Sequence, residues 1–174
     1  MNKKIFKIFW VWQNDAEENW LRNMANNGWD FIRYNWFFYT FKRTEPKDYV
    51  YKLDYKGNRK NDVAEYINLF EDAGWEHVGR FQDWYYFRTN ASLHKETPDI
   101  YSHLESKVKK YKDLSNFILN VLIAVLTIFF TIVLPAKYAY VSILQILYVI
   151  LILLNGFSYV RLLRKIRRME RTHI

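Results

Sequence analysis

The 174-residue sequence contains no cysteine. This absence excludes disulfide bonds, thiolate metal ligands and a cysteine nucleophile, and it suits a reducing compartment. The sequence also lacks a glycine-rich phosphate loop, a nucleophile elbow and a zinc-protease helix. No histidine has a second histidine or a carboxylate at the spacing of metal ligands; the four are His77, His94, His103 and His173. We therefore expect no enzyme activity, no cofactor and no metal site.

Two long runs lack any ionised residue, LSNFILNVLIAVLTIFFTIVL at 114–134 and YAYVSILQILYVILILLNGFSYV at 138–160. Each supplies the roughly 20 mostly apolar residues that a helix needs to cross the hydrocarbon core of a membrane. Because backbone polar groups in lipid must be satisfied within the segment, both runs are predicted to be helices. The sequence predicts a transmembrane hairpin that turns at 135–137. A helical hairpin buried in a soluble core is the alternative, and no amphipathic face favours it.

Polar side chains inside the two runs are expected to hydrogen-bond to a neighbouring helix, within the hairpin or in a dimer. They are Asn120, Gln145 and Asn155. A transport path is the alternative, but neither run contains the charged residue that such a path usually needs.

The formal net charge of +8 is concentrated near the C-terminus. Residues 1–114 hold 19 Lys and Arg against 17 Asp and Glu, so this part of the chain is close to neutral. Basic residues precede the first run and follow the second, whereas the connection between them carries only Lys137. The positive-inside rule therefore predicts a multi-pass protein of the cell membrane with its head and C-terminal tail in the cytoplasm. The tail residues expected to contact anionic headgroups are Arg161, Arg164, Lys165, Arg167 and Arg168.

Residues 1–90 alternate between strand and helix patterns. Strands are predicted at 4–12 and 49–55, with an aromatic hairpin at 29–42 that turns near 34–35. A single long strand is the alternative for 29–42. Two helices are predicted from apolar stripes, which contain Ala16, Trp20, Leu21 and Met24 in one and Val63, Tyr66, Ile67, Phe70 and Ala73 in the other. Gly28 and Gly74 follow these stripes and are expected to end the helices in a left-handed conformation. The acid pairs Glu17–Glu18 and Glu71–Asp72 are expected to face solvent.

The two halves of this region match each other at an offset of 46 residues, which pairs Gly28-Trp29 with Gly74-Trp75. Two β-α-β-β repeats side by side predict a ferredoxin-like α+β sandwich. Chance matching of aromatic residues is the alternative. The predicted domains are an α+β head at 1–90, a linker and charged helical lead at 91–113, the transmembrane hairpin at 114–160 and a basic tail at 161–174.

Aromatic residues exceed what two short helices can cover, and six of them form the candidate binding face: Trp10, Trp12, Trp36, Tyr39, Trp84 and Tyr86. One interpretation is a large aromatic core. A second is an exposed platform for a peptide, another subunit or an apolar ligand. Stacking of single-stranded nucleic acid is a third, but the near-neutral head lacks the clustered Lys and Arg that phosphates need.

Several stretches resemble a bacterial family of uncharacterised membrane proteins, a domain of unknown function. They are FKIFWVW, EENWLRNMANNGW, YVYKLDY, YINLFEDAGWEHVGRFQDWYYFR and PDIYSHLESKVKKYK. The sequence departs from the family pattern at Asp83, where a small residue is more usual. Members of the family pair an aromatic-rich head with two C-terminal transmembrane helices and are often encoded beside PadR-type transcriptional regulators. The resemblance implies a membrane-associated regulatory or sensory protein and brings no established catalytic residue.

These observations predict a membrane-tethered cytoplasmic module that senses or sequesters a protein or small ligand in a regulatory pathway. Its expected partners are membrane lipids, a protein such as a PadR-type regulator, or a second copy of the chain, and no nucleic acid. The alternative is an accessory subunit of a transport or envelope-stress system that acts through its hairpin.

Overall fold

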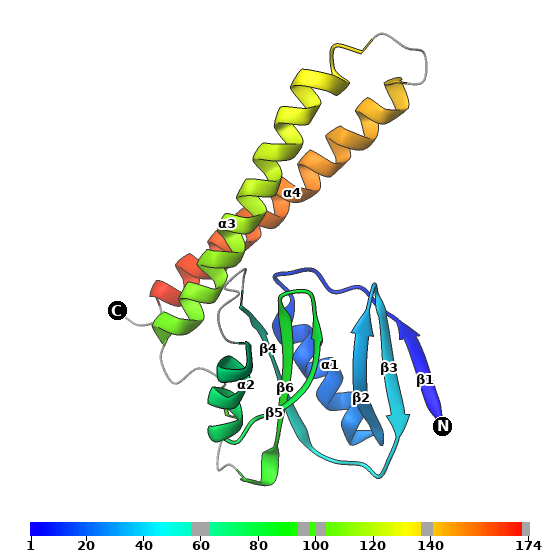
Figure 1. Cartoon of the computed structure of the whole chain (residues 1–174), viewed down its shortest axis with the longest axis vertical. Coiled ribbons are helices and arrows are strands. Elements are labelled where there is room, and N and C mark those ends of the chain that lie inside the picture. The colour runs from blue at the N-terminus through cyan, green and yellow to red at the C-terminus, as the bar shows by residue number, and fades with distance from the viewer. Residues whose placement is uncertain (57–62, 94–97, 100–103, 137–140, 172–174) are drawn as a thin grey trace. The chain divides into compact units, whose positions relative to one another are not determined.

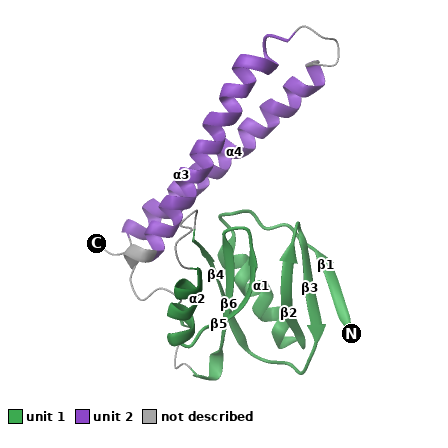
Figure 2. Ribbon diagram, viewed as in Figure 1, with its two compact units in different colours: residues 1–103 green, residues 104–174 purple. Residues whose placement is uncertain are grey.

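The computed structural model describes residues 1–56, 63–93, 98–99, 104–136 and 141–171. The chain divides into two compact units, residues 1–103 (unit 1) and residues 104–174 (unit 2), which Figure 2 colours separately. His94, His103, His173 and Lys137 lie outside the described residues.

Unit 1 contains two three-stranded antiparallel sheets, each made from a continuous part of the chain (Figure 1). The first sheet has the order β1-β3-β2 and the second the order β4-β6-β5. The elements are β1 (Asn2–Phe6), α1 (Asn14–Asn26), β2 (Trp29–Asn35), β3 (Phe38–Arg43), β4 (Tyr49–Tyr55), α2 (Val63–Asp72), β5 (Glu76–Phe81), β6 (Trp84–Asn90) and a 3₁₀ turn at Ala91–Leu93. The predicted α+β class is confirmed. The ferredoxin-like arrangement is not confirmed, because the described strands form two sheets.

Two predicted strand boundaries are wrong. The first strand was expected to reach Trp12, but β1 ends at Phe6 and the chain then turns. That turn is closed at Gln13, whose backbone N–H donates to the Trp10 carbonyl and whose side-chain Oε1 accepts from the Trp10 N–H. The hairpin turns at Trp36 and Phe37 instead of 34–35, and both residues have positive φ, as a type I′ hairpin turn requires.

In the core of unit 1, α1 packs against strands of both sheets, and β2 and β5 lie next to each other. Leu21 and Ala25 of α1 contact a buried cluster drawn from both sheets, which contains Phe31, Tyr39, Phe41, Tyr51, Leu53 and Tyr86. The other face of the second sheet is covered by α2, where Phe70 packs with Val50, Tyr85 and Phe87. The alternation predicted for 49–55 is confirmed, since successive side chains of β4 enter these two different clusters.

The two hairpins have the same strand register. Each carries a register shift, between Phe31 and Arg33 in the first and between His77 and Gly79 in the second. Phe31 lies opposite Phe41, and His77 lies opposite Phe87, so pairing and irregularity recur at the same spacing of 46 residues. Gly28 and Gly74 have φ values of +76° and +83°, which confirms the predicted left-handed conformation after each helix.

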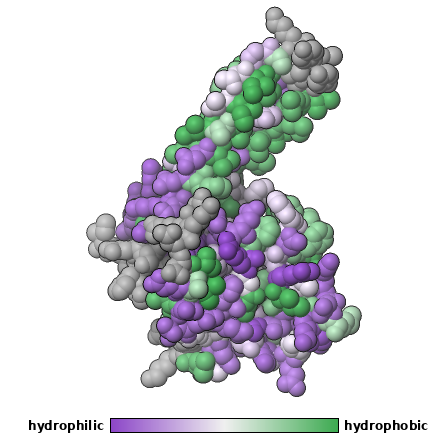
Figure 3. Space-filling model, in the orientation of Figure 1, coloured by the Kyte–Doolittle hydropathy of each residue, from purple (hydrophilic) through white to green (hydrophobic). Residues whose placement is uncertain are grey.

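Unit 2 is a pair of long helices, α3 (Leu104–Ile128) with a π-helical extension (Phe129–Val133), and α4 (Val141–Arg171). Both are long and apolar enough to cross a membrane, by length and composition. The helices include residues 114–133 of the first predicted apolar run and 141–160 of the second, and α4 continues without a break through the predicted basic tail as far as Arg171. Residues 138–140 of the second run lie outside the described part of the chain. In Figure 3 hydrophobic side chains cover much of the visible surface of the apolar runs.

Most of the buried apolar side chains in the described part of unit 2 lie near one end of the helix pair. Tyr111 and Leu114 of α3 are buried, as are Leu162 and Ile166 of α4. An ion pair joins Lys112 to Glu170 at 2.8 Å. Apolar side chains nearer the start of α4 are exposed; they include Ile143, Ile146, Leu147, Ile150 and Leu153.

Candidate ligand-binding pocket

The N-terminal half of α1 buries polar residues. Asn14 is 3% exposed, and Glu17 and Glu18 are each 8% exposed. The expectation that Glu17 and Glu18 face solvent is therefore wrong, whereas Glu71 and Asp72 are exposed as expected. Ala16, which was placed on the apolar stripe, is also exposed. The buried face follows the helical spacing through Asn14, Glu17, Glu18, Leu21 and Ala25, so its first turn and a half is polar.

Glu17 is hydrogen-bonded to tyrosines from both sheets. The hydroxyl of Tyr39 on β3 donates to Glu17 Oε1 at 2.7 Å, and the hydroxyl of Tyr86 on β6 donates to the same oxygen at 3.0 Å. Burial and the negative charge of Glu17 raise the pKa of Tyr39 and the pKa of Tyr86 far above the usual range. Both phenols therefore remain protonated donors at any physiological pH.

Glu18 has different partners, all on β4. Its Oε2 accepts from Lys52 Nζ at 3.0 Å, and its Oε1 accepts from the backbone N–H of Leu53 at 3.0 Å. A carboxylate that accepts hydrogen bonds from a backbone N–H and from a lysine has the partners that a buried charge requires. Glu18 therefore attaches α1 to the second sheet.

Glu17 lies in a pocket of about 200 Å³. The pocket is lined by Phe9, Trp10, Val11, Asn14, Glu17, Tyr34, Tyr39, Leu53, Phe81, Gln82, Trp84 and Tyr86. These residues come from the turn after β1, from α1, from five strands (β2 to β6) and from the β5–β6 turn. Asn14 Nδ2 is buried and has no hydrogen-bond partner within the described part of the chain. A buried amide donor without a partner is unusual in folded proteins and needs an explanation.

Four of the six predicted aromatic residues line this pocket. Tyr39 and Tyr86 are buried in it, and Trp84 is half-buried and contacts the ring of Tyr55 at 5.4 Å. Trp10 is at the rim, 46% exposed, with its ring stacked on Trp12 at 5.4 Å. Trp12 and Trp36 are not among the lining residues.

Sequence reasoning missed the polar floor of the pocket. Asn14 was not singled out, and Glu17 was assigned to a solvated face. A usable signal is the spacing along α1: Glu17 follows Asn14 by three residues and precedes the apolar Leu21 by four, so all three lie on one helical face. Leu53, Phe81 and Gln82 carry no comparable signal, because only the packing of the second sheet against α1 and the first sheet brings them to the pocket around Glu17.

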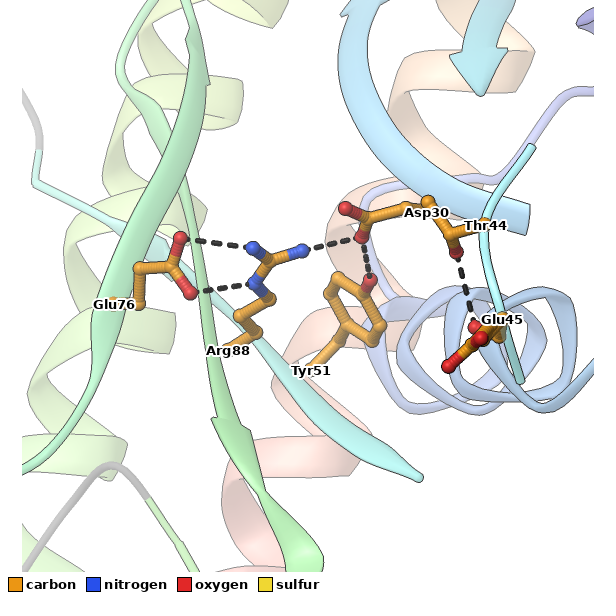
Figure 4. Close-up of polar contacts among 6 residues, drawn as sticks. All are labelled: Asp30, Thr44, Glu45, Tyr51, Glu76 and Arg88. Atoms are coloured by element: carbon orange, nitrogen blue, oxygen red, sulfur yellow. Dashed lines mark hydrogen bonds and ion pairs between the residues drawn. The ribbon is translucent and has the colours of Figure 1, made fainter. Parts of the chain in front are cut away.

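A second polar cluster connects the two sheets outside this pocket (Figure 4). Arg88 on β6 forms two hydrogen bonds with Glu76 on β5, at 2.7 and 2.8 Å, and an ion pair with Asp30 on β2. Tyr51 on β4 also donates to Asp30, and burial together with the charge of Asp30 raises the pKa of Tyr51 to about 12. The guanidinium of Arg88 is paired with the carboxylates of Asp30 and Glu76, so we interpret the cluster as a structural link between the sheets.

One of the three predicted polar residues in unit 2 bonds to the other helix, as expected. Gln145 Nε2 donates to the Val133 carbonyl at 3.2 Å, a bond from α4 to the π-helix. Asn155 donates to the Leu151 carbonyl one turn earlier in α4, and Asn120 is exposed.

The basic residues of α4 lie on the end of the helix that follows the apolar run. Four arginines spaced along one helical face line a shallow hollow: Arg164, Arg167, Arg168 and Arg171. Arg161 lies over the ring of Phe157 at 5.2 Å, and Lys165 lies over the ring of Tyr111 at 4.6 Å. The predicted anchoring residues therefore share one end of α4.

The fold and pocket define an α+β domain with a small aromatic cavity, followed in the chain by two long apolar helices. The chain belongs to the family described as "Protein of unknown function (DUF2812)", whose model matches residues 13–123. The match begins at the turn before α1 and ends within α3, so it includes most of the pocket. No curated protein and no solved structure matches the chain.

Proposed function

We propose that this protein is a membrane-anchored binding module whose unit 1 holds a small ligand in the pocket around Glu17. The observation that carries the proposal is the buried amide of Asn14, whose Nδ2 has no partner in the described residues and which lines a cavity. A concave site with apolar walls and a few converging polar groups is the usual form of a small-molecule site. At about 200 Å³, the cavity suits a ligand smaller than most drugs.

The anchoring part of the proposal is supported by the composition of unit 2. Its two helices satisfy the length and hydropathy of membrane spans, and their apolar side chains are exposed over most of α4. Apolar side chains exposed in this way are stable in lipid and unfavourable in water. With basic residues before the first span and after the second, the positive-inside rule gives a cytoplasmic unit 1 and a cytoplasmic C-terminus in the cell membrane.

We also propose that the two halves of unit 1 are an internal repeat, as in a ferredoxin-like domain. The common spacing of the register shifts and of the glycines after both helices supports this. In this proposal only the first half keeps a polar helix face, which it uses for the pocket. A regulatory partner such as a PadR-type regulator would respond to the occupied pocket.

The proposal is tested by asking which compounds the protein retains. The full chain, purified in a maltoside detergent, is incubated with a small-molecule extract, washed and analysed by mass spectrometry. Trp10→Ala removes an exposed ring at the pocket rim and is expected to abolish retention of a specific compound. Phe6→Ala is the matched control, because Phe6 is 59% exposed and does not line the pocket. The proposal would be contradicted if the unaltered chain retained no compound, or if Trp10→Ala and Phe6→Ala retained the compound equally.

A further inference from the structure

The lining of the pocket has an unusual balance of charge and aromatic surface. Seven of its residues are aromatic, one is the carboxylate Glu17, and none is Lys, Arg or His. Lys7 lies over the rings of Phe9 and Trp20, at 5.2 and 4.6 Å from their centroids, but is not among the lining residues. The lining therefore combines one carboxylate with several aromatic rings, whose faces carry partial negative charge, and its remaining residues are uncharged.

The position of the carboxylate is fixed from two sides. Glu17 belongs to the first turn of α1, and its Oε1 accepts from Tyr39 and from Tyr86, which come from different sheets. All three side chains are buried. A fixed carboxylate among aromatic rings attracts a cation more strongly than a carboxylate in water does, because its surroundings screen the charge less.

We infer that the pocket binds a small organic ammonium ion, with its charge toward Glu17 and its methyl or methylene groups against the aromatic rings. Aromatic faces attract ammonium groups through the ring quadrupole, and Trp and Tyr are the best partners. Trp10, Trp84 and Tyr34 supply such rings around the cavity. A hydroxyl or carbonyl oxygen on the same ligand would accept the free hydrogen bond of Asn14 Nδ2.

This inference rests on the proposed function and names the chemical class of the ligand. The size of the cavity favours compounds such as choline and other small amino alcohols over larger drug-like cations. Anionic ligands are disfavoured, because the carboxylate would repel them in a site without a lining cation.

The test compares a cation with its uncharged isostere. Choline and 3,3-dimethylbutan-1-ol have nearly the same shape, and only choline carries a charge. Both are titrated by calorimetry into the full chain in maltoside micelles, which contain no ammonium headgroup. We expect choline to bind about tenfold or more tightly than the alcohol.

Glu17→Gln keeps the shape and an acceptor oxygen but removes the charge. It is expected to weaken choline binding about tenfold or more, and to change binding of the alcohol by less than about twofold. Glu71→Gln makes the same chemical change at an exposed site on α2 and is expected to leave both affinities unchanged. If Glu17→Gln does not fold, Trp10→Leu replaces it, with Phe6→Leu as control, and only Trp10→Leu is expected to weaken choline binding.

Equal affinities for choline and the alcohol, or unchanged choline binding in Glu17→Gln, would overturn the inference. Binding of the alcohol alone would also overturn it, while leaving a ligand-binding pocket as proposed. Binding of neither compound would overturn the ammonium assignment, and the compounds retained from the extract would then decide the proposed function separately.

Discussion

Glu17 and Glu18 are adjacent in the sequence, but their carboxylates have different roles in unit 1. Glu17 enters a cavity with two tyrosines, whereas Glu18 binds the backbone and a lysine of β4. Glu17 therefore lines the pocket proposed to hold a ligand, whereas Glu18 attaches α1 to the second sheet. Substitutions at the two positions should therefore affect different properties.

Glu18→Ala should destabilise unit 1 by about 2–4 kcal/mol, because the buried Leu53 N–H and Lys52 both lose their partner. Glu18→Gln keeps an acceptor and should cost about half as much. Urea unfolding of the full chain is followed by tryptophan fluorescence, since all seven tryptophans lie in residues 1–103. Glu71→Ala, at an exposed site, should change stability by about 0.5 kcal/mol or less. An equal loss in Glu18→Ala and Glu71→Ala would contradict the role of Glu18.

His77 should make unit 1 less stable in mild acid. Burial lowers the pKa of His77 in the folded state, and its Nε2 has no partner in the described residues. His77 therefore binds a proton less readily in the folded state than in the unfolded chain, where histidine has a pKa of about 6.5. The contribution of His77 to stability is complete above that pH and is lost as the pH falls below it.

His77→Phe should reduce this pH dependence, and phenylalanine suits the site because Phe31 occupies the corresponding position in the first hairpin. The urea midpoints of both proteins at pH 8 and pH 5.5 provide the measurement. The same fall in both proteins would show that His77 does not contribute.

Single residues also mark where sequence reasoning fails. The position of Glu17 in a first turn is typical of a solvated residue that favours the positive helix end. Its burial depends on Tyr39 and Tyr86, which are 22 and 69 residues away in the chain. No local pattern contains that information, so the acidic floor of the pocket was predicted to face solvent.

At the scale of elements, the turns after α1 and α2 have the same backbone conformation but different surroundings. A Cβ at Gly28 would lie 2.7 Å from the Thr44 carbonyl oxygen, whereas a Cβ at Gly74 would meet nothing within 4 Å. Both glycines have positive φ, so an alanine at either site carries a conformational cost of about 1–2 kcal/mol.

Gly28→Ala should therefore destabilise unit 1 clearly more than Gly74→Ala, because only the first variant adds a steric clash with the backbone. Urea unfolding by tryptophan fluorescence compares the two, and each glycine is the control for the other. A larger loss in Gly74→Ala would contradict the described geometry of the α1–β2 turn.

The helices and most strands could be predicted, because their signals are local. Glycine after an apolar stripe identified both helix ends, and alternation identified β4. The alternation of 4–12 continues past Phe6, but Phe6 pairs with Phe38, where β3 begins, and the chain then turns through Gln13. The division into two sheets depends on which strands pair, and that choice lies in contacts between distant parts of the chain.

At the scale of the whole molecule, each unit has its own source of stability. Unit 1 has an aromatic core with two buried carboxylates, and unit 2 has exposed apolar helices with a small core at one end. The apolar helices were predictable from length and the absence of charge. Continuation of α4 to Arg171 was not predicted, although residues 161–171 contain good helix formers and no Gly or Pro.

The central claim is that two spans hold unit 1 on the cytoplasmic side of the membrane, and the absence of cysteine allows a direct test. Single cysteines are introduced by Ser92→Cys in unit 1, Ala136→Cys between the spans and Arg171→Cys at the end of α4, and intact cells are treated with a membrane-impermeant maleimide. We predict that only Ala136→Cys reacts in intact cells, and that Ser92→Cys and Arg171→Cys react only after lysis. Reaction of all three in intact cells, or of none until lysis, would contradict the account.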